Sequence, residues 1–472
     1  MKYITYSLVV IGLLSSSLLA EDDFEVPVLD GASYRTIFST SSKSKKESNY
    51  QGIEIVDGWE ISGDIRAGWV QYDYQNKPTG INASGNIIPT NPNTNQGHID
   101  SQGIYTMPKI SISSPKDSRM HAKATIAGAT DFGINDEKYE KRNFVFDPNE
   151  RKPFWIVQEA YISYEDRNHK LLAGREELST PMIDSDDWYM LANSFELAYY
   201  TNTSFENITF NLGFFAKMSG VWDSGANGTE FHSMSSASFV ASADKVKIGA
   251  TGVYFAAFEY NDDKSHKLQV WDYYAQDMYN TLFIQYDFTN SLRNFNYDIG
   301  AQFINFKEVG YLATAAAVTD IDYSMYSVKF DGDFSNGINF ATGATKYTNG
   351  VGQGATLGAF GGYPYFANGM IFHFFEAGSL QNAASYKAQL AYDFSKIAVD
   401  DLWIGYRYTY FDLDSSHSFN RSGVAQNAMA LNGVRVSYGG KVGAYFTGTY
   451  EHVDLDNEPN TFSLRLIGGY KF

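Results

Sequence analysis

Short segments whose side chains alternate in character recur from Trp59 to the end of the chain. Side chains point to opposite faces along a strand, so this alternation predicts strands with one apolar face and one polar face. In the first segment the apolar or small face is Trp59, Ile61, Gly63, Ile65, Ala67 and Trp69, and the other is Glu60, Ser62, Asp64, Arg66 and Gly68. A Trp at each end of the apolar face fits the two aromatic girdles of a transmembrane barrel.

The repeated pattern predicts an all-β chain, a transmembrane antiparallel β-barrel of about 18 strands, an even number as in bacterial barrels. After the first, strands are expected near 104–114, 119–130, 154–164, 169–177, 195–203, 207–217, 235–243, 245–258, 275–288, 294–305, 321–331, 337–346, 383–394, 401–413, 427–438, 441–452 and 461–472. Short connections alternate with long ones, including 131–153, 178–194, 259–274 and 347–382. Short periplasmic turns and long outer loops are typical of such barrels.

The N-terminus has the pattern of an export signal. Lys2 precedes an apolar run from Leu8 to Leu14, and small residues lead to Ala20, after which acidic residues follow. We therefore predict a signal peptide over 1–20, although Leu18 is larger than the usual residue at its position. The run is too short to span a bilayer as a helix. Residues 21–57 are predicted to be a polar periplasmic extension before a barrel over 58–472.

Composition excludes several other classes of protein. Aromatic residues make up 16% of the chain, which a disordered chain does not carry, and 35 Tyr, 34 Phe and 41 Gly disfavour a helical fold. There are no cysteines, so disulfides, Cys-ligated metals and thiol nucleophiles are absent. The net charge of −18 argues against a nucleic-acid partner.

The final segment is an amphipathic strand that ends on Phe472. Phe462, Leu464, Leu466 and Tyr470 share one face with it. This pattern resembles the terminal strand of outer-membrane proteins, where it is similar to the assembly signal. It predicts a cell outer membrane of a Gram-negative bacterium as the location. An ordinary edge strand is the alternative.

The chain resembles the OprD-type family of 18-stranded, substrate-selective outer-membrane porins. The residues that carry this resemblance are Gly174 to Ile183, Asp186 to Leu191, Ser194 to Glu196, Gly361 to Phe366 and Ala391 to Phe394. Family members are similar in having a strand that ends in Gly with a charged residue, then a Pro and acidic residues. An Arg that often follows the acidic residue is replaced here by Asp187 or Trp188. The resemblance implies a channel in which basic residues guide a substrate carboxylate.

Bases that alternate with apolar residues are candidates for the lumen. We expect Arg66, Lys109, Lys123, Arg175, Lys217, Lys329, Arg407, Arg435 and Arg465 to point inward. Rings of Arg and Lys favour anions. The alternative is that these bases are solvated or paired with acids.

Two long connections are candidates for segments that fold into the pore. Residues 178–194 carry Asp184, Asp186 and Asp187 beside Pro181 and Trp188, and they are the expected constriction loop. Acids facing bases across a pore create a field that orients zwitterions. An extracellular acidic turn or a calcium site are the alternatives. Residues 347–382, rich in Gly and aromatics, form either a second inward loop or an outer loop on the rim.

No catalytic motif is present. The eight His residues are scattered, and neither H-E-x-x-H nor G-x-S-x-G occurs, so we predict no enzyme activity and no cofactor. The expected function is diffusion of small hydrophilic solutes, among them carboxylate-bearing or zwitterionic ones, through a charged constriction. The alternative is a structural or adhesive barrel with a plugged lumen. The expected partners are outer-membrane lipid and small solutes, with the porin a monomer or a homotrimer.

Overall fold

The fold is taken from a computed structural model of the whole chain. It describes residues 53–56, 58–73, 80–81, 87–88, 101–115, 118–135, 152–185, 190–219, 230–238, 240–262, 264–348, 350, 360–371, 379–397, 399–418, 425–439, 442–457 and 460–472. Within those ranges no helix is long and apolar enough to cross a membrane. The predicted signal peptide lies outside the described residues and remains a prediction.

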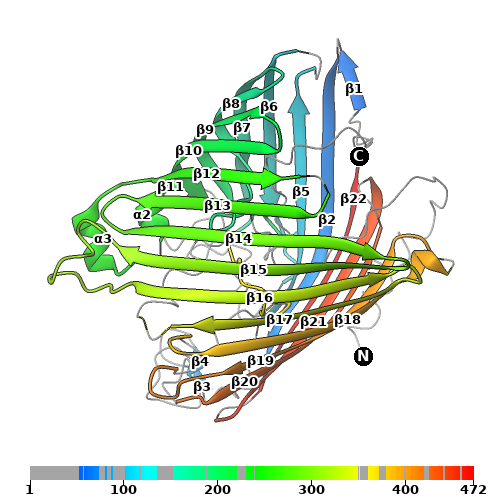
Figure 1. Cartoon of the computed structure of the whole chain (residues 1–472). Helices are drawn as coiled ribbons and strands as arrows, with labels where there is room; N and C mark the ends of the chain where they lie inside the picture. Colours follow the sequence, from blue (N-terminus) through cyan, green and yellow to red (C-terminus); the bar gives the residue numbers. More distant parts are fainter. Residues whose placement is uncertain are drawn as a thin grey trace.

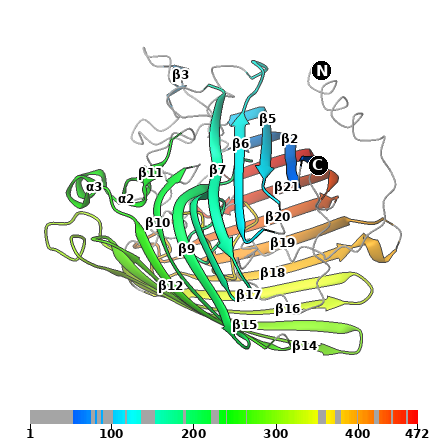
Figure 2. The same cartoon turned by 90° about the horizontal axis from the view of Figure 1, so that it is seen from above.

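Eighteen antiparallel strands form a closed barrel, which confirms the predicted fold class (Figures 1 and 2). They are β2 (Trp59–Asp73), β5 (Ser101–Ser113), β6 (Met120–Ala129), β7 (Phe154–Glu165), β8 (His169–Glu176), β9 (Ser194–Phe205), β10 (Ile208–Ser219), β12 (Val253–Asn261), β13 (His266–Ala275), β14 (Tyr279–Leu292), β15 (Phe295–Glu308), β16 (Asp322–Phe334), β17 (Ile338–Tyr347), β18 (Ala384–Asp393), β19 (Leu402–Asp412), β20 (Ala428–Tyr438), β21 (Gly443–Leu455) and β22 (Thr461–Lys471). Each pairs with the next, and β22 pairs with β2 to close the barrel. Beyond β22, Phe472 exchanges two backbone hydrogen bonds with Gly63.

Shorter elements lie outside this ring. They are β1 (Ile53–Val56), β3 (Gly80–Ile81), β4 (Ile87–Ile88), β11 (His232–Ser233), α2 (Met234–Ala237), α3 (Ser242–Ile248) and η3 (Phe394–Lys396). The end of the predicted 21–57 extension is β1, which pairs with β2 through Ile53 and Ile61. In Figure 1, α2 and α3 lie at the left end of the strands, on the rim that carries the long connections.

The predicted strand at 235–243 is wrong. Ser and Ala dominate this segment, and it forms α2 and the start of α3. Asp244, predicted as a short turn, lies in α3. The predicted loop 259–274 is wrong as well, because it contains most of β13. In the described part of the chain, one predicted strand is thus absent and one strand, β13, was not predicted, so the predicted number of strands is still correct.

Exposure separates the two faces of the wall. On β5, for example, Ile104, Ile110 and Ile112 are exposed on the outside, whereas Tyr105 and Met107 are buried inside. On β12 to β16 the inward side chains are large aromatics, including Phe255, Trp271, Tyr273, Phe283, Phe306 and Tyr323. The lumen is therefore partly filled with apolar packing beneath the long connections, as side chains and loops fill other barrels.

Candidate functional site

The connection after β8 folds into the lumen. Leu178, Met182, Ile183 and Met190 are buried within the apolar cluster of the lumen. The segment turns back on itself through a hydrogen bond from the Thr180 N–H to the Ile183 carbonyl at 2.7 Å. Apolar side chains here therefore pack against other protein groups and not against bulk water.

The connection between β17 and β18 also enters the lumen, at residues 360–371, which we call the strap. It runs along the inner wall and bonds in turn to each of the strands β16 to β21. The contacts are Phe366 N–H to Ser327 Oγ (3.4 Å), Ala367 N–H to Thr345 Oγ1 (3.4 Å), Ser385 Oγ to the Ala367 carbonyl (2.9 Å), Thr409 Oγ1 to the Asn368 carbonyl (2.8 Å), Arg435 Nη2 to the Met370 carbonyl (3.1 Å) and Met370 N–H to Glu451 Oε1 (2.6 Å). Of the two positions predicted for 347–382, the described part occupies the inward one.

The two inward segments meet. Ile183 forms isolated backbone bridges with Phe360 and Gly361, and the Asp184 N–H donates to the Phe360 carbonyl at 2.9 Å. A Cβ atom on Gly362 would lie 2.4 Å from the carbonyl carbon of Met182, so only glycine fits at this approach. Together the segments form one transverse element inside the barrel.

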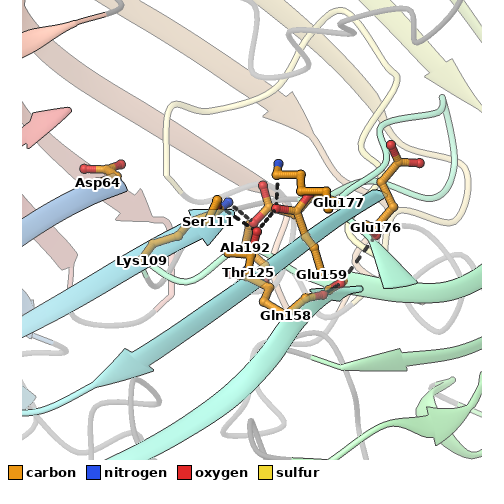
Figure 3. Close-up of polar contacts among 12 residues, drawn as sticks. Asp64, Lys109, Ser111, Thr125, Gln158, Glu159, Glu176, Glu177 and Ala192 are labelled. Atoms are coloured by element: carbon orange, nitrogen blue, oxygen red, sulfur yellow. Dashed lines mark hydrogen bonds and ion pairs between the residues drawn. The ribbon is translucent and has the colours of Figure 1, made fainter. Parts of the chain in front are cut away.

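A charged cluster lines the inner wall of β5 to β8 (Figure 3). Lys109 Nζ lies 2.5 Å from Glu177 Oε1, and Lys123 Nζ lies 2.8 Å from Glu159 Oε2. Thr125 donates to Glu159 at 2.6 Å. The Lys109, Glu177 and Lys123 side chains keep 21%, 25% and 28% of their surface exposed, whereas Glu159 keeps 4%. This cluster therefore presents both signs of charge to the water of the lumen.

A β-bulge places Glu159 in this cluster. On β7 one extra residue, Gln158, lies between the positions that pair with Ile126 and Thr125. Gln158 and Glu159 are consequently both buried on the inner side, although they are adjacent in sequence. Bulges commonly re-aim a side chain in this way.

The inner wall of β14 to β16 carries a second cluster, in which acids outnumber bases. Lys329 Nζ lies 3.5 Å from Asp287, 3.3 Å from Asp298 and 3.3 Å from Asp331. It also lies 5.3 Å from the ring centre of Phe366 in the strap. One base faces three acids here, so Lys329 is paired and not an isolated cation.

The predicted bases on β19 and β20 contact the strap. Arg407 is 2% exposed and donates to Gln389, Asn368 and the Gly369 carbonyl. Arg435 donates to Thr449 and to the Met370 carbonyl. Both point inward, and their contacts are structural ones that hold the strap. Arg66 on β2 lies 3.7 Å from Asp64, and Arg465 on β22 has the inward parity of the buried Ser463.

Two of the predicted inward bases point outward. Arg175 pairs in register with the exposed Ala160 and with Glu196 on β9, whose neighbours Phe195 and Leu197 are the buried, inward ones. The adjacent residues Leu171 and Leu172 made the alternation ambiguous on β8. Lys217 follows an irregularity between Phe215 and Lys217 that reverses the parity of β10. The predicted inward positions of Arg175 and Lys217 are therefore wrong.

The predicted acidic loop is described in part. Asp184 is half-buried, and its carbonyl accepts a hydrogen bond from the Asn193 side chain at 3.2 Å. Asp186 and Asp187 lie outside the described residues, so a convergence of the three acids with the bases stays a prediction. Among the described residues, no group of three His, Cys, Asp or Glu side chains is arranged to hold a metal ion.

Comparison with known proteins agrees with this architecture. The profile described as outer membrane porin, OprD family, matches residues 167–431, more than half of the chain. The chain belongs to the OprD family of outer membrane porins. No curated protein matches it in sequence.

Solved structures of OprD-type porins share the fold. Acinetobacter baumannii OccAB4 is 16% identical, with a TM-score of 0.67 over 90% of this chain and 100% of that one. Pseudomonas aeruginosa OccK8 (OprE) is 14% identical, with a TM-score of 0.66 over 88% and 98%. P. aeruginosa OpdK, in a structure with vanillate, is 13% identical, with a TM-score of 0.64 over 87% and 98%.

This OprD-family porin is thus a channel for small solutes in the outer membrane of a Gram-negative bacterium. Its family and fold are those of channels and not of enzymes. The rim with long connections, where α2 and α3 lie, corresponds to the outer side of such porins.

Several inward charges of the porin were missed from the sequence. They are Glu159, Glu177, Glu259, Asp287, Asp298, Asp331, Lys387 and Glu451. Most of them alternate with apolar residues along their strands, as the predicted inward bases do. The same alternation rule, applied to acids as well as bases, therefore predicts the inward acids. Glu159 is the exception, because its bulge has no sequence signal of its own.

Proposed function

We propose that this porin passes small carboxylate-bearing or zwitterionic solutes, and that the charged cluster on β5 to β8 makes the selective contact. The observation that carries the proposal is the pairing of Lys109 with Glu177 and of Lys123 with Glu159 on the inner wall. A solute carboxylate would compete for the lysines, and a solute ammonium group would compete for Glu177.

Exposure favours this cluster over Lys329 and Arg407. The Lys109 and Lys123 side chains keep 21% and 28% of their surface exposed, whereas Lys329 keeps 10% and Arg407 only 2%. A residue that is already enclosed by the strap has no surface left for a passing solute. We therefore assign Arg407 and Arg435 to holding the strap, and Lys109 and Lys123 to the solute.

The described charges are also unevenly distributed around the lumen. Asp287, Asp298 and Asp331 surround one lysine on β14 to β16, whereas Lys387, Arg407, Arg435 and Arg465 lie on β18 to β22 with Glu451. Neighbouring sectors of opposite charge orient dipolar solutes and disfavour apolar ones. Vanillate, named with the OpdK structure, is an aromatic carboxylate and so belongs to the class proposed here.

Ion selectivity in planar bilayers tests the proposal. Lys109→Gln should lower the anion-to-cation permeability ratio, measured from the reversal potential under a KCl gradient, by roughly twofold, and Glu177→Gln should raise it. Lys307→Gln is the matched control, since Lys307 is exposed on β15 opposite Asp322, with the parity of the outward Ile299. Equal ratios for all three variants would contradict the proposal.

Solute flux tests the substrate class separately. Liposomes containing the porin should swell faster in vanillate than in its neutral methyl ester, and Lys109→Gln should remove most of the difference. If the ester enters as fast as the acid in the unmodified porin, the cluster does not select for carboxylates.

A further inference from the structure

A row of charged side chains crosses the outer face of the barrel at one level of β8 to β10. Arg175 Nη2 and Nε donate to Glu196 Oε1 at 2.7 and 3.0 Å, and Lys217 Nζ lies 3.0 Å from Glu196 Oε2. The register aligns the three residues, because Arg175 pairs with Glu196 and Glu196 pairs with Lys217. We call these residues the outer row.

The surroundings of the outer row face lipid. Ala160 and Ala198 beside it are exposed, as are Val157, Ile162 and Leu171 on the same face. The Phe231 ring covers the Arg175 guanidinium at 4.1 Å. A cation that faces lipid is strongly unfavourable at the bilayer midplane, but the free-energy cost is small near the interface.

The outer row lies near the outer interface. Phe205 and Phe210 are exposed beside the short turns and pack with the half-buried Phe258, as in a girdle. Glu196 and Phe205 are at opposite ends of β9, about 30 Å apart at a rise of ~3.4 Å per residue. With strands tilted by about 40°, this is about 23 Å along the membrane normal, close to the ~25 Å height of the apolar band. The row therefore lies at the level of the outer-leaflet headgroups.

An irregularity in the register of β10 places Lys217 in the outer row. Without the irregularity after Phe215, Lys217 would share the inward parity of Phe215 and face the lumen. The irregularity turns it outward, where 47% of its side chain is exposed, compared with 34% for Arg175. Two bases share one carboxylate, so the row carries an excess of positive charge.

We propose that the outer row binds the phosphate group of an outer-leaflet lipid. A lysine ammonium has three donors and a guanidinium has five. The contacts to Glu196 engage one donor of Lys217 and two of Arg175, and Arg175 Nη1 also donates to the Val157 carbonyl at 3.4 Å. The remaining donors point along an exposed face at headgroup level, where the phosphates of a lipid such as lipid A lie. Charge-assisted bonds to phosphate are among the stronger hydrogen bonds.

Native mass spectrometry of the full-length, detergent-purified porin with added bis-phosphorylated lipid A tests this proposal. Lys217→Gln should weaken lipid retention about tenfold, as expected for the loss of one charge-assisted hydrogen bond. Glu196→Gln should strengthen retention, because it removes the competing carboxylate. Lys307→Gln, which removes another exposed base beside an acid, should leave retention unchanged, and dephosphorylated lipid A should not distinguish the variants.

Three results would overturn the proposal. Equal retention by Lys217→Gln and the unmodified porin would leave the row without a lipid role. Weaker retention by Glu196→Gln would mean that the row is only an internal ion pair that supports the wall. A change in subunit number in Lys217→Gln, with lipid retention unaltered, would identify a second copy of the chain as the occupant. Unchanged single-channel conductance in each variant verifies that the barrel is intact.

Discussion

The backbone N–H of Asp184 donates to the carbonyl oxygen of Phe360 at 2.9 Å, although the two residues belong to different long connections. Through this bond the segment after β8 and the strap hold each other across the lumen. The approach is close because Gly362 has no Cβ, and one added there would lie 2.4 Å from the backbone of Met182. The position of each inward segment therefore depends on the other.

Gly362→Ala should separate the two segments. The added methyl group meets backbone atoms, which cannot rotate away, and loss of one hydrogen bond of about 1 kcal/mol raises the population of the parted state by roughly fivefold. Single-channel recordings should show correspondingly more frequent sub-conductance events. Gly448→Ala on β21 is the control, because its nearest neighbours are side-chain atoms at 3.2 Å or more. Identical traces for both variants would show that the segments do not control the pore.

Glu451 anchors the end of the strap. Its two carboxylate oxygens accept the N–H groups of Met370 and Ile371, each at 2.6 Å, and the side chain is fully buried. Glu451→Gln replaces one acceptor with an NH₂ group that opposes an N–H, at a cost of about 1.5–3 kcal/mol. Hydrogen exchange at the Met370 and Ile371 amides should accelerate by about tenfold or more. Glu165→Gln, at an exposed strand end, should not change it.

The outer rim should respond to acid through Asp244. Burial alone would raise the pKa of this carboxyl, but hydrogen bonds from the Thr319 and Val318 N–H groups outweigh it and hold the pKa below its usual value. A lowered folded pKa means that the contact stabilises α3 and the β15–β16 loop fully above the unfolded carboxyl pKa of about 3.9. This stabilisation is lost as the pH falls through the folded pKa.

Hydrogen exchange at the Val318 and Thr319 amides, corrected for the intrinsic rate, measures this effect. Protection should be constant from pH 7 to pH 5 and should fall below about pH 4. Asp244→Asn should lower protection at neutral pH and remove its pH dependence, whereas Asp320→Asn in the same loop should keep both. Protection that persists unchanged at low pH would contradict the role of Asp244.

Alternation predicted the wall because lipid imposes it. A residue that faces hydrocarbon must be apolar, so in segments such as β2 and β22 the alternation shows clearly which side chains face the lipid. The rule weakens where the inner face is apolar too. On β13, Trp271 and Tyr273 are buried inside while Val270 and Tyr274 lie on the outer side, and the sequence alone predicts a loop here.

The charged residues were harder to place, because one extra residue reverses the parity. The bulge at Gln158 brings Glu159 inside, and the irregularity before Lys217 turns that lysine outside. Neither has a Gly or Pro that marks it in the sequence. Which bases are paired also depends on residues far apart in the chain, as with Lys329 and Asp287.

Removing Lys123 from its pair with the buried Glu159 should strongly destabilise the fold. Only 4% of the Glu159 side chain is exposed, so Lys123→Gln leaves a carboxylate without its charge partner inside the wall. Removing one partner of a buried pair typically costs about 3–5 kcal/mol. The double variant Lys123→Gln/Glu159→Gln should recover much of this loss, because it leaves no unpaired charge.

The same double-mutant cycle at Lys109 and Glu177, whose side chains are 21% and 25% exposed, should give a coupling energy of about 1 kcal/mol or less. Urea unfolding of the porin in lipid vesicles, followed by tryptophan fluorescence, gives the four free energies of each cycle. A coupling energy at Lys123 and Glu159 no larger than that at Lys109 and Glu177 would mean that water reaches Glu159 and screens its charge.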